Sequence, residues 1–210
     1  MKFIRKGSEP ASLIAFKAMA NEDWTPSYGN LDLQVKRDLE AALLEEQGHI
    51  CCYCERELLE GDFHIEHFRP QSLFPEQNLV FSNLLCSCLN KLGRKEPRHC
   101  GVLKDNWFDE ESLISPTTPD CETRFTYTGD GRIYAAKGDS AAGISRQRLG
   151  LDIPKLVAMR KKVIEVFLDP NLSDQKFLEF VRDYQNRDSN GRFGPFVTTI
   201  KHLFQEKADL

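Results

Sequence analysis

Residues 61–72 read GDFHIEHFRPQS, and this stretch decides how the centre of the chain is interpreted. Phe63 and Ile65 alternate with polar residues as in a half-buried β-strand, and His67 continues the same face. Glu66 and His67 are adjacent, which places a hard oxygen ligand beside a proton acceptor. An isolated Glu-His residue pair is more often structural or simply exposed, so the function of this one has to be inferred from the residues around it.

A cysteine motif precedes this strand. Cys51 and Cys54 form C-x-x-C in HICCYCERELL, a spacing that lets two thiolates of one turn bind a single tetrahedral Zn²⁺. Cys52 lies between them and should point away. The alternative is a redox dithiol, which the absence of a βαβ pattern around the motif disfavours.

Further cysteines follow the strand and are needed to complete a zinc site. Cys88, in NLLCSC, and Cys100, in RHCG, are the expected partners, whereas Cys86 reads as a buried core thiol, with its exchange for Cys88 left open. The expected structural zinc ligands are therefore Cys51, Cys54, Cys88 and Cys100.

A basic insertion separates Cys88 from Cys100. It lies in the stretch NKLGRKEPRHCGVLK, residues 90–104. Its cations, against the single acid Glu96, are Lys91, Arg94, Lys95, Arg98 and Lys104. Such a run either contacts a polyanion or is an ordinary solvated face.

The composition is that of a folding protein without membrane spans. The 210 residues are 40% hydrophobic and 29% charged, and no apolar run approaches the roughly 20 residues of a membrane helix. The N-terminus MKFIRKGSEPASLIAF lacks the apolar block of a signal peptide, so we expect a cytoplasmic location. Seven cysteines in that reducing compartment, an odd number, argue against a disulfide framework. Because the net charge is -4, any contact with nucleic acid must be local or supplied by a partner.

The remaining chain is mainly helical by hydrophobic period, apart from a β-hairpin at ETRFTYTGDGRIYAA. The expected helices cover about 10–20, 31–48, 140–150, 154–168, 173–187 and 193–206. We predict an α+β fold, mostly helical, with a zinc-supported centre of two strands and a helix. The expected segments are an N-terminal helical part (1–48), the core (49–110), and a hairpin with C-terminal helices (111–210).

The central motifs resemble the HNH nuclease signature of the ββα-metal family: IEH, a proline three residues on, then NLL and cysteines. The resemblance implies that Glu66 binds a catalytic Mg²⁺ or Mn²⁺ and that His67 takes a proton from water. It also implies that Asn83 holds the histidine loop through hydrogen bonds. Arg69 and Lys104 become candidates for binding the substrate, although Arg69 reads equally well as a surface arginine.

One position departs from that pattern. The signature ends in a cysteine followed by asparagine or histidine, with lysine three residues later, whereas this chain reads CGVLK with Gly101 at the ligand position. His99 is the first choice for the missing ligand because imidazole binds metals well, with Asn90 and Asn106 as alternatives. His64 has no role in the motif.

A wider likeness covers about residues 45–165, through HIEHFRPQS, NLLCSC, HCG, ISP, GDGRI and RLGLDIPKLVAMRKKV. This stretch resembles the HNH subunit, PtuB, of Septu-type anti-phage systems, including those carried with retrons. The resemblance implies an ABC/SMC-like ATPase partner of the PtuA type and, in a retron, a reverse transcriptase with its RNA–DNA product.

The leading hypothesis is thus an HNH endonuclease acting on DNA or tRNA. The rival is a non-catalytic zinc module that binds nucleic acid or a protein through its basic loop. FGPFVTTIKHLF, residues 193–204, is the first choice for docking the ATPase, with an ordinary core-facing helix as the alternative.

Overall fold

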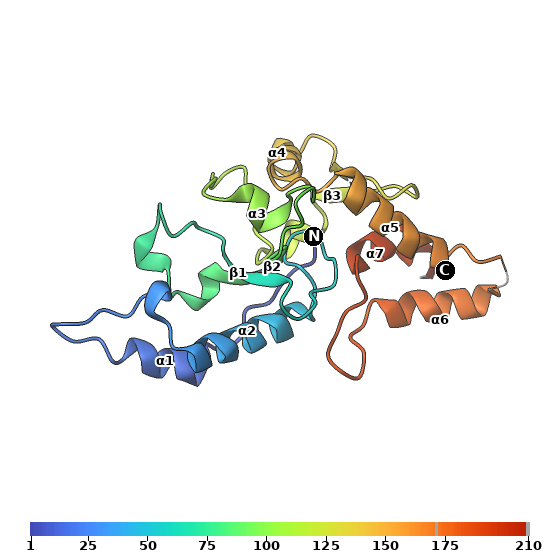
Figure 1. The fold of residues 1–210 in the computed structure, drawn as a ribbon. Coiled ribbons are helices and arrows are strands. Elements are labelled where there is room, and N and C mark those ends of the chain that lie inside the picture. The colour runs from blue at the N-terminus through green and yellow to red at the C-terminus, as the bar shows by residue number, and fades with distance from the viewer. Residues whose placement is uncertain (171, 209–210) are drawn as a thin grey trace.

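The computed structural model describes residues 1–170 and 172–208 (Figure 1). Along the described chain, two pairs of short strands lie among the helices, and α4 to α7 follow the second pair. The helices are α1 (Ala11–Lys17), α2 (Leu33–Gln47), α3 (Cys100–Lys104), α4 (Ser140–Arg148), α5 (Pro154–Val166), α6 (Asp174–Tyr184) and α7 (Val197–Ala208). The strands are β1 (Phe63–His67), β2 (Leu84–Cys88), β3 (Phe125–Tyr127) and β4 (Ile133–Ala135). The mixed fold of helix and strand agrees with the prediction.

The strands form two antiparallel pairs. In the first, β1 pairs with β2 so that His64 faces Ser87 and Ile65 faces Cys86. In the second, β3 pairs with β4 across the predicted GDG turn. Gly131 in that turn has φ of 87°, which glycine adopts without the steric penalty of a side chain.

The first pair lies between two helices, with α2 on one side and α3 on the other (Figure 1). The end of α2 is tied to β2 by the side chain of Gln47, which accepts from the Cys86 N–H at 2.6 Å and donates to the Cys86 carbonyl at 2.9 Å. Gly48 then ends the helix with φ of 60°, as its position in the sequence predicts. These contacts set the turn carrying the first cysteines against β2.

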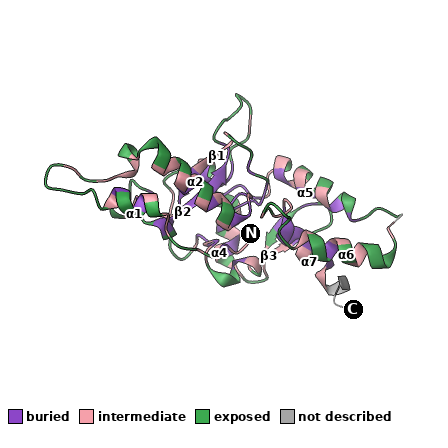
Figure 2. Ribbon diagram, turned by 90° about the horizontal axis from the view of Figure 1, so that it is seen from below, coloured by how far each residue is buried: buried purple, intermediate pink, exposed green. Residues whose placement is uncertain are grey.

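The molecule is elongated, with α1 at one end, α6 at the other and the N-terminus near the middle (Figure 1). Buried side chains concentrate in the centre and again between the C-terminal helices (Figure 2). The second cluster consists of Ile164, Phe167, Val181, Ile200 and Phe204.

The C-terminal helix corrects one prediction. Phe196, Val197, Ile200 and Phe204 all point into the interior and are at most 6% exposed. The helical part of the segment, from Val197 on, therefore faces the core, and these four apolar side chains are not available to dock a partner. The amphipathic pattern arose because α7 packs on α6 and β3.

The other predicted helices appear near their expected positions, and α5 begins at Pro154 as expected. None of the helices within the described ranges is long and apolar enough to span a bilayer. The division into 1–48, 49–110 and 111–210 stays a prediction.

Candidate metal centre and active site

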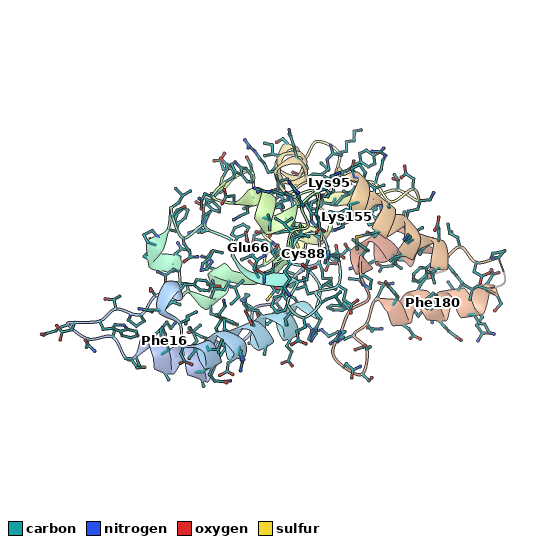
Figure 3. All side chains as sticks on the ribbon, viewed as in Figure 1. Phe16, Glu66, Cys88, Lys95, Lys155 and Phe180 are labelled. Atoms are coloured by element: carbon teal, nitrogen blue, oxygen red, sulfur yellow. The ribbon has the colours of Figure 1, made fainter. Side chains whose placement is uncertain are left out.

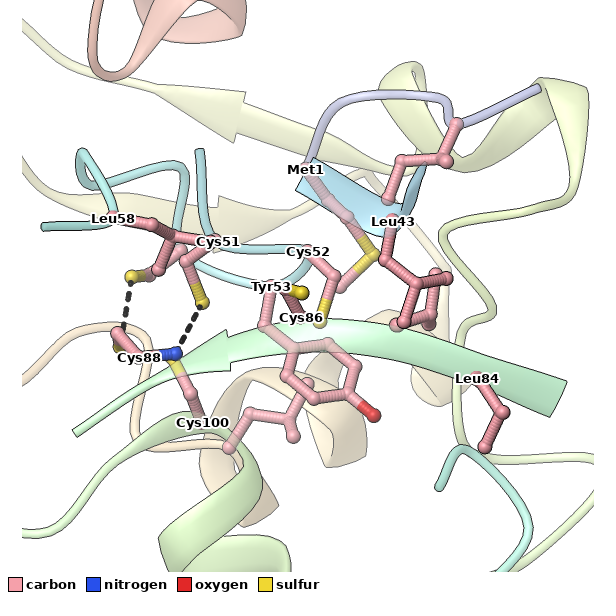
Figure 4. Packing of buried hydrophobic residues seen from close by; sticks show 14 of the residues in the cluster. Met1, Leu43, Cys51, Cys52, Tyr53, Leu58, Leu84, Cys86, Cys88 and Cys100 are labelled. Atoms are coloured by element: carbon pink, nitrogen blue, oxygen red, sulfur yellow. Dashed lines mark hydrogen bonds between the residues drawn. The ribbon is translucent and has the colours of Figure 1, made fainter. Parts of the chain in front are cut away.

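Four cysteines from three parts of the chain meet at one point (Figure 4). Cys51 and Cys54 stand on the turn after α2, Cys88 ends β2, and Cys100 begins α3. Their Sγ atoms all lie within 4.8 Å of one another, and all four side chains are buried. These are the four cysteines that the sequence analysis grouped.

The spacing of these thiols fits a tetrahedral metal. Zn–S bonds of about 2.3 Å put the sulfurs of a tetrahedral site roughly 3.8 Å apart. The Sγ atoms of Cys54 and Cys88 are 3.8 Å apart. The Cys88 backbone N–H also points to the sulfur of Cys51 at 3.4 Å, which favours a thiolate there. The cluster could therefore hold a metal such as Zn²⁺.

The pKa values of the four thiols differ within the cluster. Burial raises the pKa of Cys51, but hydrogen bonds from Cys100 and Cys52 outweigh it, and the pKa falls well below its usual value. For Cys54, burial is likewise outweighed, mainly by the hydrogen bond with Cys100, and the pKa falls to about 7. Burial instead raises the pKa of Cys88 and Cys100 in the same cluster, and it also raises the pKa of Cys52 and of Cys86. Figure 4 shows these last two on the side toward Leu43, as core thiols.

His99 lies against the thiol cluster. Its Nδ1 is 3.1 Å from the sulfur of Cys100 and 3.7 Å from that of Cys88, and its side chain is fully buried. A histidine N–H beside a metal-binding thiolate is a typical outer-sphere contact. The sequence analysis placed His99 beside Glu66 as a ligand of the catalytic ion, whereas the structure places its ring against the sulfurs.

Glu66 lies close to the cluster in the middle of the molecule (Figure 3). Its Oε1 accepts from Tyr53 Oη at 3.1 Å and forms an ion pair with Lys104 Nζ at 2.8 Å. Its Oε2 is 3.5 Å from His64 Nε2. Burial alone would raise the pKa of Glu66, but the hydrogen bond with His64 and the charge of Lys104 lower it. The carboxylate is ionised at neutral pH, with one oxygen held by two donors.

His67 follows directly at the end of β1. Its Nε2 lies 3.0 Å from the Asn78 carbonyl oxygen and its Nδ1 lies 3.3 Å from the Gln71 amide nitrogen. Because a carbonyl only accepts, Nε2 carries the hydrogen, and the lone pair of Nδ1 accepts from the Gln71 amide. Burial lowers the pKa of His67 below its ordinary value of 6.5. The Tyr28 ring packs edge-on against the imidazole, with 4.7 Å between centroids.

Asn83 secures the loop that follows His67. Its Oδ1 accepts from the Arg69 N–H at 2.8 Å, and its Nδ2 donates to the Arg69 carbonyl at 3.0 Å and to the Gln77 carbonyl at 3.3 Å. Asn83 thus brackets the backbone two residues beyond His67.

The two predicted substrate-binding cations lie in different surroundings. Arg69 pairs with the exposed Glu110 and stacks near Phe108, and about a third of its side chain is exposed. Lys104 is only 2% exposed, and besides Glu66 its ammonium meets the His67 carbonyl at 3.1 Å. Its ammonium is directed at the carboxylate from inside the protein, not at an incoming substrate.

Glu66 and His67 line one cleft of about 200 Å³, formed between the end of β1 and α3. A larger hollow of about 560 Å³ lies beyond Asn83, and its lining includes Glu110, Glu111 and Asp120. Arg69 and Arg124 line the same hollow, but Glu66 and His67 lie outside it, so we place the chemistry in the smaller cleft.

Sequence reasoning missed two residues of this site, Tyr53 and His64. Nothing in the local pattern marks Tyr53, which reaches Glu66 from the cysteine turn. His64 did carry a signal, because residues two apart on a strand share a face and Glu66 stands at i+2.

In sequence, the chain is similar to two bacterial proteins, one named after a retron and one after a Septu system. It is 30% identical over 139 residues to a protein of Vibrio cholerae serotype O1 biovar El Tor named "Retron Vc95 putative HNH endonuclease". It is 29% identical over 119 residues to the Septu protein PtuB of Bacillus thuringiensis. These comparisons confirm the resemblance that the motifs indicated.

The matches are partial. They cover 62% and 56% of this chain, and 65% and 42% of the two relatives, so the chain matches less than two thirds of either relative's length. No protein-family model matches the chain.

Proposed function

We propose that this protein is a metal-dependent HNH endonuclease that hydrolyses phosphodiester bonds of nucleic acid in a bacterial anti-phage system. The observation that carries the proposal is the pairing, in one cleft, of an ionised Glu66 with a His67 whose lowered pKa and carbonyl contact hold it neutral. The similarity to a retron protein named as an HNH endonuclease supports the reaction class.

In this proposal His67 is the general base. The Asn78 carbonyl holds the Nε2 hydrogen, which leaves Nδ1 directed to accept a proton. A water replaces the Gln71 amide at Nδ1, gives its proton to that nitrogen, and forms the new bond from its oxygen to phosphorus. The bond from phosphorus to the 3′ oxygen breaks, and that oxygen takes a proton from solvent. The products are a 5′ phosphate and a 3′ hydroxyl.

Glu66 holds the catalytic ion. Its Oε2 is the available ligand, since Oε1 is engaged by Tyr53 and Lys104. A bound Mg²⁺ or Mn²⁺ supplies charge that neutralises a phosphate oxygen and the leaving 3′ oxygen. Asn83 fixes the loop beyond His67 and so keeps the base in position.

The four thiols have a structural role in this proposal. Zinc on Cys51, Cys54, Cys88 and Cys100 joins the turn after α2 to β2 and α3, the elements that form the cleft. The metal therefore supports the active site without taking part in hydrolysis.

The proposal includes an ATPase partner of the ABC/SMC-like, PtuA type that controls access to nucleic acid. Two observations support it: the similarity to a protein named Septu protein PtuB, and the net charge of -4, which disfavours tight nucleic-acid binding by the chain alone. The proposed substrate is DNA or tRNA. The site residues do not distinguish the two polymers, because hydrolysis by an activated water requires no 2′-hydroxyl.

The test is cleavage of supercoiled plasmid and of bulk tRNA with Mg²⁺ or Mn²⁺, with and without the co-expressed ATPase. His67→Ala should lower the rate by about 10²–10⁴-fold while zinc content and nucleic-acid binding stay unchanged. His202→Ala, an exposed histidine of α7 that does not line the cleft, is the matched control and should cut normally.

Equal cutting by wild type and His67→Ala would contradict the assignment of the base. If neither polymer is cut with the partner present, although the zinc-loaded protein binds it, the non-catalytic zinc module becomes the better account.

A further inference from the structure

The helix α3 comes unusually close to the functional face of β1 at one residue, Gly101. A Cβ built on Gly101 would overlap Glu66 Oε2 and lie 2.7 Å from His64 Nε2. No real side chain packs at such distances, so residue 101 has to be glycine while these two groups keep their positions. The space that a helix side chain would occupy is filled by the imidazole of His64 and the carboxylate of Glu66.

The strand register places these groups together. His64 and Glu66 are two residues apart on β1 and share one face. Opposite His64, Ser87 accepts from the Gly101 N–H at 3.0 Å, which fixes the start of α3 against the sheet. The approach of the helix and the position of the histidine are therefore set by backbone contacts.

The two donor atoms have the separation of ligands on one ion. His64 Nε2 and Glu66 Oε2 are 3.5 Å apart. Metal bonds of about 2.1–2.2 Å at angles between 90° and 110° put neighbouring ligand atoms roughly 3.0–3.6 Å apart. The His64 ring is partly exposed, at 26%, so an ion can reach it from solvent.

We propose that His64 is the second protein ligand of the catalytic ion. The two ligand atoms are then His64 Nε2 and Glu66 Oε2. Helix α3 supplies no ligand and contributes only the space left by the missing side chain of Gly101. This inference rests on the proposed nuclease function and names the residue that completes its ion site. Because Mg²⁺ prefers oxygen ligands and imidazole suits transition metals, the pair selects Mn²⁺ over Mg²⁺.

The test measures binding of Mn²⁺ alone to the zinc-loaded protein, by electron paramagnetic resonance, with Mg²⁺ as competitor. His64→Ala should weaken Mn²⁺ binding at least tenfold and leave the lower affinity for Mg²⁺, measured by competition, nearly unchanged. The variant should therefore lose the preference for Mn²⁺ over Mg²⁺. If His64 had only a structural role, its replacement would lower the affinities for Mn²⁺ and Mg²⁺ together. His202→Ala is the matched control.

Two further variants keep the test decisive if His64→Ala folds poorly. Gly101→Ala retains every ligand, yet its methyl group should displace Glu66 and abolish Mn²⁺ binding. His64→Gln offers an amide oxygen in place of the imidazole nitrogen and should keep ion binding without the preference for Mn²⁺. Zinc content and thermal unfolding report whether each variant is folded.

The outcomes separate this inference from the proposed function. Mn²⁺ binding that depends on Glu66 but is unchanged in His64→Ala overturns the ligand assignment and leaves the nuclease proposal intact. The ligand assignment is also overturned if wild type shows no Glu66-dependent Mn²⁺ signal. Mn²⁺ binding that depends on His64, in a protein that cuts neither DNA nor tRNA, supports the ion site and overturns the nuclease.

Discussion

Lys104 Nζ lies 2.8 Å from Glu66 Oε1, and both side chains are buried. The ammonium neutralises the carboxylate from the interior and leaves Oε2 directed at His64 and the cleft. A lysine that sequence reasoning assigned to substrate binding thus lies behind the candidate ion site.

Replacing Lys104 with methionine should destabilise the protein and alter its response to metal. Breaking a buried ion pair from one side typically costs about 3–5 kcal/mol, because the remaining charge is left uncompensated. Added Mn²⁺ should recover part of this loss by pairing with Glu66. Urea unfolding with and without Mn²⁺ measures both effects, and Lys176→Met on the exposed face of α6 should change neither. Equal stability of Lys104→Met and wild type without metal would contradict the pairing.

Cys88 and Cys86 offer a matched pair of variants for the zinc prediction, since both are buried and stand two residues apart on β2. Cys88→Ala should lose zinc and most of the folded population, because three thiolates hold the metal weakly and the metal joins three parts of the chain. Cys86→Ala should keep one zinc and lose only core packing. Elemental analysis together with circular dichroism distinguishes them. Full zinc in Cys88→Ala would exclude that residue as a ligand.

The pH dependence should follow His67. Its pKa lies below 6.5 because burial disfavours the charged ring, so the acid limb of the cleavage profile should have its midpoint below pH 6.5. The same shift bears on stability: the unfolded chain takes up the proton first as the pH falls. The contribution of the neutral ring is therefore fully present above pH 6.5 and is lost between 6.5 and the lowered folded-state pKa. An acid limb centred above 6.5 would indicate a different base.

Asn83→Ala should loosen the loop beyond His67. The variant leaves the Arg69 backbone groups and the Gln77 carbonyl without their partner, at a cost of about 1–3 kcal/mol. We expect a lower turnover with little change in ion binding, since Asn83 touches no ligand. Asn186→Ala removes a hydrogen bond to the Arg182 carbonyl on α6, outside the cleft, and serves as the control. Unchanged turnover and stability in Asn83→Ala would remove it from the site.

The loop between Cys88 and Cys100 carries exposed Lys91, Arg94, Lys95 and Arg98, and its acid Glu96 is paired with Lys155 of α5. Figure 3 shows Lys95 and Lys155 on the same side of the molecule. If this loop contacts phosphates, replacing Arg94, Lys95 and Arg98 with alanine should weaken nucleic-acid binding and flatten its salt dependence by about three charges. An unchanged salt slope would mark the loop as an ordinary solvated face.

The sequence by itself determined much of this protein. The helical periods, Pro154 at the start of α5, Gly48 at the end of α2 and the GDG hairpin all depend on local conformational preferences, which short windows express. The C-x-x-C spacing and the Glu66–His67 pair also follow from neighbouring residues, as does the likeness to HNH nucleases.

Only the tertiary structure decided which side chains face each other. The apolar face of residues 193–204 looked equally suited to a partner or to the core, and burial of Phe196 and Ile200 decided for the core. The surroundings of His99 and His64 were decided in a similar way: the start of α3 directs His99 toward the sulfurs, while the register of β1 directs His64 toward Glu66. Hydrophobic period specifies that a face is buried, but the partner of that face depends on contacts between residues distant in the chain.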